Sequence, residues 1–161
     1  MDGMGGALDS LRRAQLEARI QELNRLISQY RNEIHYYAGQ ITKIDRSYES
    51  ITGFKGVVQQ SQDCFSEASK GKSSVLEQVG AVSRNNAAAK KYYDGMKRVL
   101  TGTGAKIASK LYGFLLAKIG SEQSSLRNQS NNYSDKIAYY NRLIDNAQTE
   151  LAQKTQELQR L

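Results

Sequence analysis

The chain opens with a regular ladder of apolar residues whose spacing alternates between four and three positions. This ladder runs from Leu16 to Ile51. A second ladder with the same spacing runs from Tyr112 to Leu161. Its lapses are Gln123, Ser130 and Lys154. Spacing of this kind places a narrow apolar stripe on a long helix, and another helix must cover that stripe. The pattern therefore predicts two long helices, each in need of a helical partner.

The first helix is expected to run from about Ala7 to Ile51. Gly53 and Gly56 follow the ladder, and glycine commonly ends a helix. We therefore expect the Gly-Phe-Lys-Gly segment at 53–56 to form a turn.

The middle of the chain carries sparser apolar residues. Over 54–104 the pattern predicts short helices, then a firmer helix from about Asn86 to Leu100. Thr101-Gly102-Thr103-Gly104 is the clearest break in the chain. A final helix of about 57 residues is expected to follow it, and the absence of proline leaves nothing to interrupt so long a helix.

The two ladders share a local resemblance that suggests how they pair. Ile34-His35-Tyr36-Tyr37 recurs as Ile137-Ala138-Tyr139-Tyr140. Antiparallel pairing with Tyr37 opposite Tyr140 would bring both ladders together. This favours an all-α fold in one domain, residues 1–161: an elongated helical hairpin with a coiled-coil stalk (about 7–51 and 126–161) and a small helical head (about 54–125). A plain up-down-up three-helix bundle, in which the terminal helices run parallel, is the alternative.

The net charge of +7 is concentrated in one section. Between Gln78 and Ser121 there are eight basic residues and a single acidic one, Asp94. The basic patch that we single out comprises Lys90, Lys91, Lys97, Arg98 and Lys106. It could attract phosphate backbones or anionic lipids, or it could complement an acidic protein. Nucleic-acid binders interleave aromatic with basic residues, and only the Lys-Lys-Tyr-Tyr segment at 90–93 hints at that.

No constellation of catalytic residues stands out. His35 is the single histidine, which excludes histidine triads and multi-histidine metal sites. Gly71-Lys72-Ser73 resembles the end of a phosphate-binding loop, but position 66 is serine where the earlier glycine belongs. We therefore expect no enzyme activity, no metal and no cofactor.

Cys64 is the single cysteine, so no internal disulfide forms. We expect a buried, inert thiol, with an intermolecular bridge as the alternative. The start of the chain lacks the basic and apolar regions of a signal peptide, and no window is apolar enough to span a membrane. The protein is expected in the cytoplasm or secreted without a cleavable signal peptide.

Two features predict association with another helix. The segment from Ile107 to Ile119 is apolar nearly all round, which fits either burial in the head or a surface for a partner. Tyr36 and Tyr139 fall just off the ladders and widen the stripe beyond what one helix covers. The expected partner-binding residues are Tyr36, Tyr37, Ile41, Ile137, Tyr139, Tyr140 and Ile144.

The chain resembles the small helical proteins of Gram-positive type VII secretion, the Trp-X-Gly superfamily, and in particular the YwqH-like partners of LXG toxins. The resemblance rests on the long N-terminal ladder, on the turn with Phe54 and Gly56, and on Tyr92–Gly102 followed by a long amphipathic helix. Phe54 stands where relatives often carry tryptophan. Tyr140 is followed four residues later by Ile144 rather than by the acidic residue of the export signal.

The resemblance implies a targeting partner or chaperone that binds the helical N-terminal domain of a secreted toxin, or a small helical co-partner. Two other functions stay open at this point. One is a basic coiled-coil protein associated with nucleic acid, and the other is a structural rod that assembles with copies of itself.

Overall fold

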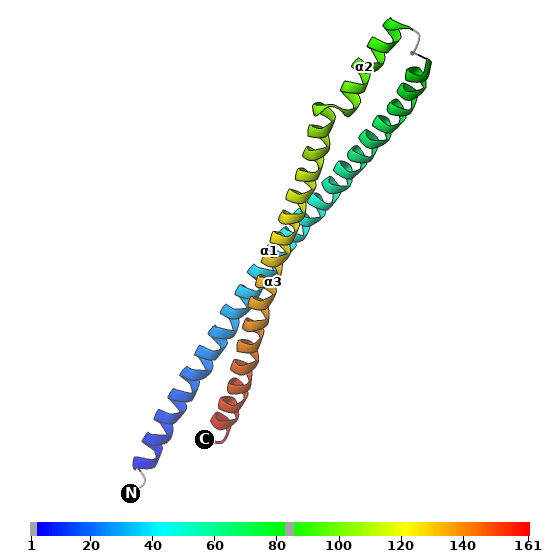
Figure 1. Cartoon of the computed structure of the whole chain (residues 1–161). Coiled ribbons are helices and arrows are strands. Elements are labelled where there is room, and N and C mark those ends of the chain that lie inside the picture. Colours follow the sequence, from blue (N-terminus) through cyan, green and yellow to red (C-terminus); the bar gives the residue numbers. More distant parts are fainter. Residues whose placement is uncertain (1–2, 83–85) are drawn as a thin grey trace. The chain divides into compact units, whose positions relative to one another are not determined.

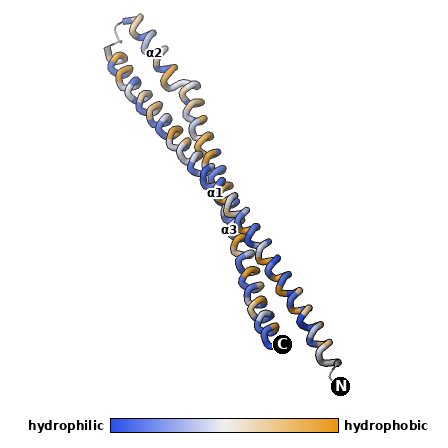
Figure 2. The backbone as a smooth tube through the Cα atoms, turned by 180° about the vertical axis from the view of Figure 1, so that it is seen from behind, coloured by the Kyte–Doolittle hydropathy of each residue, from blue (hydrophilic) through white to orange (hydrophobic). Residues whose placement is uncertain are grey.

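The computed structural model is all-α and describes residues 3–82 and 86–161. Three helices follow one another: α1 (Gly3–Val82), α2 (Ala87–Thr101) and α3 (Thr103–Gln159) (Figure 1). No strand occurs in the described ranges. Hydrophobic and hydrophilic residues alternate every few positions along the helices (Figure 2), as expected for helices that bury only a stripe.

α1 does not end where the glycines predicted. It passes through Gly53 and Gly56, so no turn forms at Phe54 and Gly56, and it replaces the short helices expected up to residue 82. No glycine in the described part has a positive φ, and a glycine inside a helix weakens it by only about 1 kcal/mol. Val58, in this part of the helix, is buried at 5% exposure.

The later helices follow the predicted boundaries. The side chain of Asn86 caps α2, because its Oδ1 accepts hydrogen bonds from the amides of Ala88 and Ala89 at 3.0 and 3.2 Å. The predicted break lies at Gly102, which has φ −79° and ψ −171° and ends α2. α3 then has the predicted length of 57 residues.

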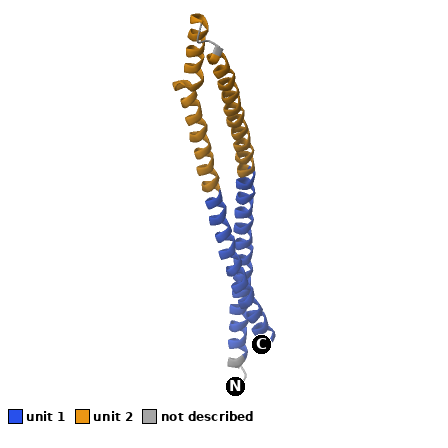
Figure 3. Ribbon diagram, turned by 45° about the vertical axis from the view of Figure 1, so that its right-hand side comes forward, with its two compact units in different colours: residues 1–46, 127–161 blue, residues 47–126 orange. Residues whose placement is uncertain are grey.

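The chain divides into two compact units, coloured separately in Figure 3. Unit 1 comprises residues 1–46 and 127–161, and unit 2 comprises residues 47–126. α1 and α3 therefore contribute to both units, whereas α2 belongs to unit 2 alone.

Unit 1 is an antiparallel pair formed by the first part of α1 and the last part of α3. Leu23, Ile27, Ile144 and Ala147 are buried together at its centre. Arg19 contacts Glu150, whereas Tyr37, later in α1, contacts Tyr133, earlier in α3. The two segments thus run antiparallel, not parallel as the three-helix bundle required.

In unit 2, α1 packs against both α2 and α3. The rings of Phe65 and Tyr112 lie 6.1 Å apart, and Gln123 Nε2 donates to Thr52 Oγ1 at 2.9 Å. Gly80 lies so close to α2 that a Cβ there would come within 2.5 Å of the Tyr93 ring.

Candidate interaction surfaces

The packed face of each helix, which we call the seam, divides its exposed surface into two flanks. Successive residues turn by about 100° around a helix, so the residue before a seam position and the residue after it lie on opposite sides of the seam. When two helices run antiparallel, the residues just before the seam positions of both helices lie on the same side of the pair. The residues just after each seam position share the other side. Arg19 and Glu150 illustrate the rule in unit 1: each precedes a half-buried seam residue, and they meet in a two-pronged ion pair of 2.7 and 2.9 Å.

Unit 1 contains a cluster of six tyrosines. Four of them are half-buried in the seam, with ring centroids 5.6 to 6.1 Å apart in three contacts. These four are Tyr30, Tyr37, Tyr133 and Tyr140. Burial raises the pKa of the Tyr140 phenol above its ordinary value. The Lys136 ammonium lies 5.0 Å from the centre of the Tyr37 ring, a cation–π distance.

The two remaining tyrosines point outward. Tyr36 is 57% exposed and Tyr139 is 56% exposed, and they pack edge-on against Tyr37 and Tyr140 respectively. Each precedes a seam residue, so both lie on the same flank of unit 1.

The other predicted partner-binding residues belong to the seam. Ile41 and Ile137 are half-buried, as are Tyr37 and Tyr140, and Ile144 is buried in the core. Their contacts are therefore largely taken up within unit 1, and Tyr36 and Tyr139 are the two that present a free face. The partner-binding role itself stays a prediction.

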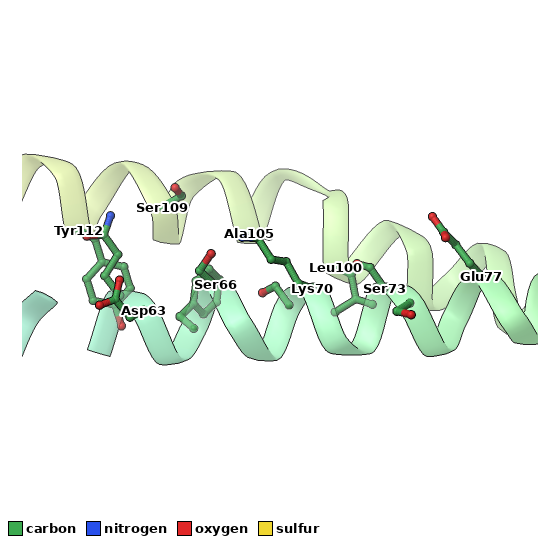
Figure 4. Close-up of a pocket in the computed structure, with 13 residues that line it drawn as sticks. Asp63, Ser66, Lys70, Ser73, Glu77, Leu100, Ala105, Ser109 and Tyr112 are labelled. Carbon is green, nitrogen blue, oxygen red and sulfur yellow. The ribbon is translucent and has the colours of Figure 1, made fainter. Parts of the chain in front are cut away.

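In unit 2, the flank that follows the seam is polar. Lining a groove of about 680 Å³ on this flank are Asp63, Ser66, Lys70, Ser74 and Glu77 on α1 and Ser109 on α3. Figure 4 shows the labelled lining residues, among them Asp63, Lys70 and Glu77, near the interruption between Leu100 and Ala105. The groove exists because the seam here carries small residues, such as Ser69, Ser73 and Ala105, that leave space between the helices.

This polar groove holds no recognisable catalytic arrangement. Ser73 lines it, whereas the adjacent Lys72 lines a different groove on the other flank. The two residues thus diverge, unlike the lysine and serine of a phosphate-binding loop. No group of three or more potential metal ligands gathers anywhere in the described residues.

The flank that precedes the seam in unit 2 is rich in exposed apolar side chains. We call this set the apolar flank: Phe54, Val57, Cys64 and Val75 on α1, Tyr92 and Val99 on α2, and Ile107, Leu111 and Leu115 on α3. Between α1 and α2 it opens into an apolar groove of about 300 Å³. Lining this groove are Gly71, Lys72, Val75, Leu76, Val79, Tyr92, Met96 and Leu100.

The segment from Ile107 to Ile119 is only partly covered. Ile119 is buried, but Ile107, Leu111 and Phe114 are 52%, 61% and 69% exposed. Burial within the same molecule, one of the two predicted alternatives, therefore does not hold for this face of α3.

The predicted basic patch is spread around its helices. All five residues are exposed, but Lys90 and Lys97 follow seam residues whereas Lys91 and Arg98 lie farther round α2. Lys97 lies 5.6 Å from the centre of the Tyr93 ring. Lys106 is on α3, and Arg84, also in the basic section, lies outside the described residues.

The prediction for Cys64 was wrong, because its side chain is exposed. Cys64 immediately precedes the seam residue Phe65, so it lies on the apolar flank rather than in the core. The apolar flank was not predicted from the sequence, because apolar residues are sparse over this part of the chain and do not form a ladder. The common position of Val57, Val75 and Val99, one residue before the seam, can be recognised only once the structure shows which residues form the seam.

No family model, no curated protein and no solved structure matches the chain. Within the described ranges, none of the helices has the length and apolar character needed to cross a membrane.

Proposed function

We propose that this protein is a non-catalytic binding protein whose partner is another helical protein. The observation that carries the proposal is the exposed apolar face of α3, formed by Ile107, Leu111, Phe114 and Leu115. Positions 107, 111, 114 and 115 follow the spacing by which one helix contacts another. A contiguous exposed apolar patch on a protein surface commonly marks an interaction site.

The more specific part of the proposal comes from the resemblance to the YwqH-like proteins. In it, unit 1 acts as a coiled-coil hairpin, and the protein is a targeting partner or chaperone of an LXG toxin of type VII secretion. The protein would bind the helical N-terminal domain of the toxin in the cytoplasm and could leave the cell with it. Packing of apolar side chains would hold the complex, as in other cases where an amphipathic helix docks on a groove.

Size-exclusion chromatography with light scattering tests this function. The purified protein is compared with the protein co-expressed with helical proteins from neighbouring genes, at low and at high salt. A defined hetero-complex that persists at high salt is expected, because apolar packing is weakly screened by ions. A salt-resistant homo-oligomer that does not bind the co-expressed proteins would contradict the proposal and indicate self-assembly instead.

Binding to nucleic acid is the second outcome that would contradict the proposal. If several phosphate contacts held the protein on a DNA duplex, its affinity for DNA would fall by orders of magnitude between about 50 and 200 mM salt. A shift of the DNA in native gels with this salt dependence, together with no protein partner, would overturn the protein-binding function.

A further inference from the structure

The two flanks of unit 2 differ in chemistry, and the difference indicates where a partner docks. The polar flank carries serines and charged residues, whereas exposed apolar side chains recur on the apolar flank of all three helices. Val75 of α1 and Tyr92 of α2 line one groove, so side chains of this flank converge across the seam. Between α1 and α2 the apolar flank is therefore concave, with a floor that includes Leu76 and Met96.

Cations border this surface. From residue 95 to residue 121 the chain contains no acidic residue. Lys110 lies three residues after Ile107, and Lys118 lies four residues after Phe114, so both are helix-surface neighbours of the apolar face. Lys72 lines the apolar groove on α1. Glu122, the acidic residue on this side, lies beyond Lys118 at the end of the unit.

We propose that the apolar flank of unit 2 is the docking surface for an amphipathic helix of the partner whose apolar stripe is bordered by acidic residues. The proposal rests on the proposed function, which supplies a helical partner, and it adds the surface and the charge of that partner. The helix would lie along the seam, place apolar side chains against Leu111 and in the groove beside Tyr92, and set its carboxylates near Lys72 and Lys118.

Two other occupants fit less well. A second copy of the chain would bring the same lysines opposite each other, and like charges across an interface oppose association. A lipid bilayer with anionic headgroups would suit the lysines, but a bilayer presents a flat boundary and would not fill a groove. A helix with protruding side chains fits both the concavity and the charge.

A pair of matched peptides tests the proposal. Both are stapled helices of about 21 residues with the same leucine stripe, and one carries glutamate and the other lysine at the positions beside the stripe. The readout is the rate at which Cys64 of the full-length protein reacts with a thiol reagent, because Cys64 lies on the apolar flank. The glutamate peptide is expected to slow the reaction and to bind at least about tenfold more tightly than the lysine peptide.

Variants of the protein locate the site. The double variant Ile107→Gln, Leu111→Gln should weaken binding of the glutamate peptide by at least about tenfold, because it removes two large apolar side chains of the apolar flank and introduces a good helix former at both positions. The matched control is Ser109→Gln, Ala117→Gln, which places the same side chains on the same helix away from the apolar flank and should leave binding unchanged. Lys110→Glu with Lys118→Glu should reverse the preference toward the lysine peptide. Circular dichroism checks that each variant keeps its helix content.

Each contrary result overturns the proposal. The first two such results are no protection of Cys64 by the glutamate peptide and an equal loss of binding in the control variant. The other two are co-sedimentation with phosphatidylglycerol vesicles, or a concentration-dependent dimer, that the Ile107 and Leu111 substitutions abolish. In the co-expression experiment, a hetero-complex that survives these substitutions would refute the docking surface while leaving the proposed function intact. The absence of any hetero-complex would instead contradict the function.

Discussion

Gly102 is the position where one added methyl group should change the packing of a whole helix. A Cβ at this residue would lie 1.9 Å from the carbonyl oxygen of Arg98, far inside normal contact. The φ of −79° suits any residue, so the obstacle to Gly102→Ala is this overlap and not the backbone conformation. The variant must therefore open the break or convert it to helix.

A continuous helix would put α2 out of phase with α3. The seam passes from Leu100 to Ala105, a step of five residues that works because Gly102 is not helical. In an unbroken helix those two residues would point about 140° apart. With α3 held in place, the stripe of α2 would turn away from α1, and Tyr93 would leave its place against Gly80.

The cost of Gly102→Ala follows from the side chains that α2 would withdraw. Tyr93, Met96 and Leu100 are half-buried, and exposing them costs about 1 kcal/mol each, or about 3 kcal/mol together. Alanine returns about 1 kcal/mol through its higher helix propensity. We therefore expect the variant to be destabilised by about 2 kcal/mol.

Urea denaturation followed by circular dichroism measures this cost, with hydrogen–deuterium exchange of α2 and of residues 71–80 as a local readout. Gly104→Ala is the control, because Gly104 is in the first turn of α3 and a Cβ there meets nothing within 4 Å. That variant should gain up to about 1 kcal/mol. If Gly102→Ala proves as stable as Gly104→Ala, the packing of α2 against α1 does not depend on the break at Gly102.

Three further predictions concern unit 1 and the thiol. Leu23, which is 1% exposed, sits in a two-helix core, so Leu23→Ala should destabilise the protein by about 2 kcal/mol in urea denaturation, near the low end for buried leucine. Hydrogen bonding to Arg19 lowers the pKa of the Glu150 carboxyl below its ordinary value. The ion pair therefore stabilises the folded protein near neutral pH, and this stabilisation is lost as the pH falls through the lowered pKa. The melting temperature of Glu150→Gln should therefore fall less than that of the parent protein on acidification, and an equal fall would contradict the ion pair. Cys64 should react with a thiol reagent in the native protein almost as fast as in urea, and strong protection would disprove its exposure.

The boundaries of the later helices could be predicted because their signals are local. Asn86 is a strong N-cap, and Gly102 between two threonines is a clear break. The continuation of α1 could not be predicted from hydrophobicity alone. Lys55 and Gln62 occupy seam positions beyond Ile51, so the four-and-three spacing continues there with polar side chains. Glycines at 53 and 56 were misleading, since neighbouring packing outweighs their modest helix-breaking tendency.

The candidate surfaces were predicted less well, for a different reason. The tyrosine repeat correctly indicated that Tyr37 and Tyr140 meet, at a centroid distance of 6.1 Å. Which of the six tyrosines of unit 1 stay exposed depends on the exact facing of the helices, and Tyr36 and Tyr139 are the two that do. Likewise, Val75 and Tyr92 are distant in the chain and share a groove only because α2 folds back on α1.

The sequence by itself determined the helical character, the phase of the seam along the two apolar ladders and the position of the break at Gly102, since periodicity, capping and glycine act within a few residues of the chain. The tertiary structure alone decided the division of unit 2 into a polar and an apolar flank. A residue one position before the seam has no distinctive local signal. It joins its counterparts on the other helices only when antiparallel pairing brings the same side of each helix together.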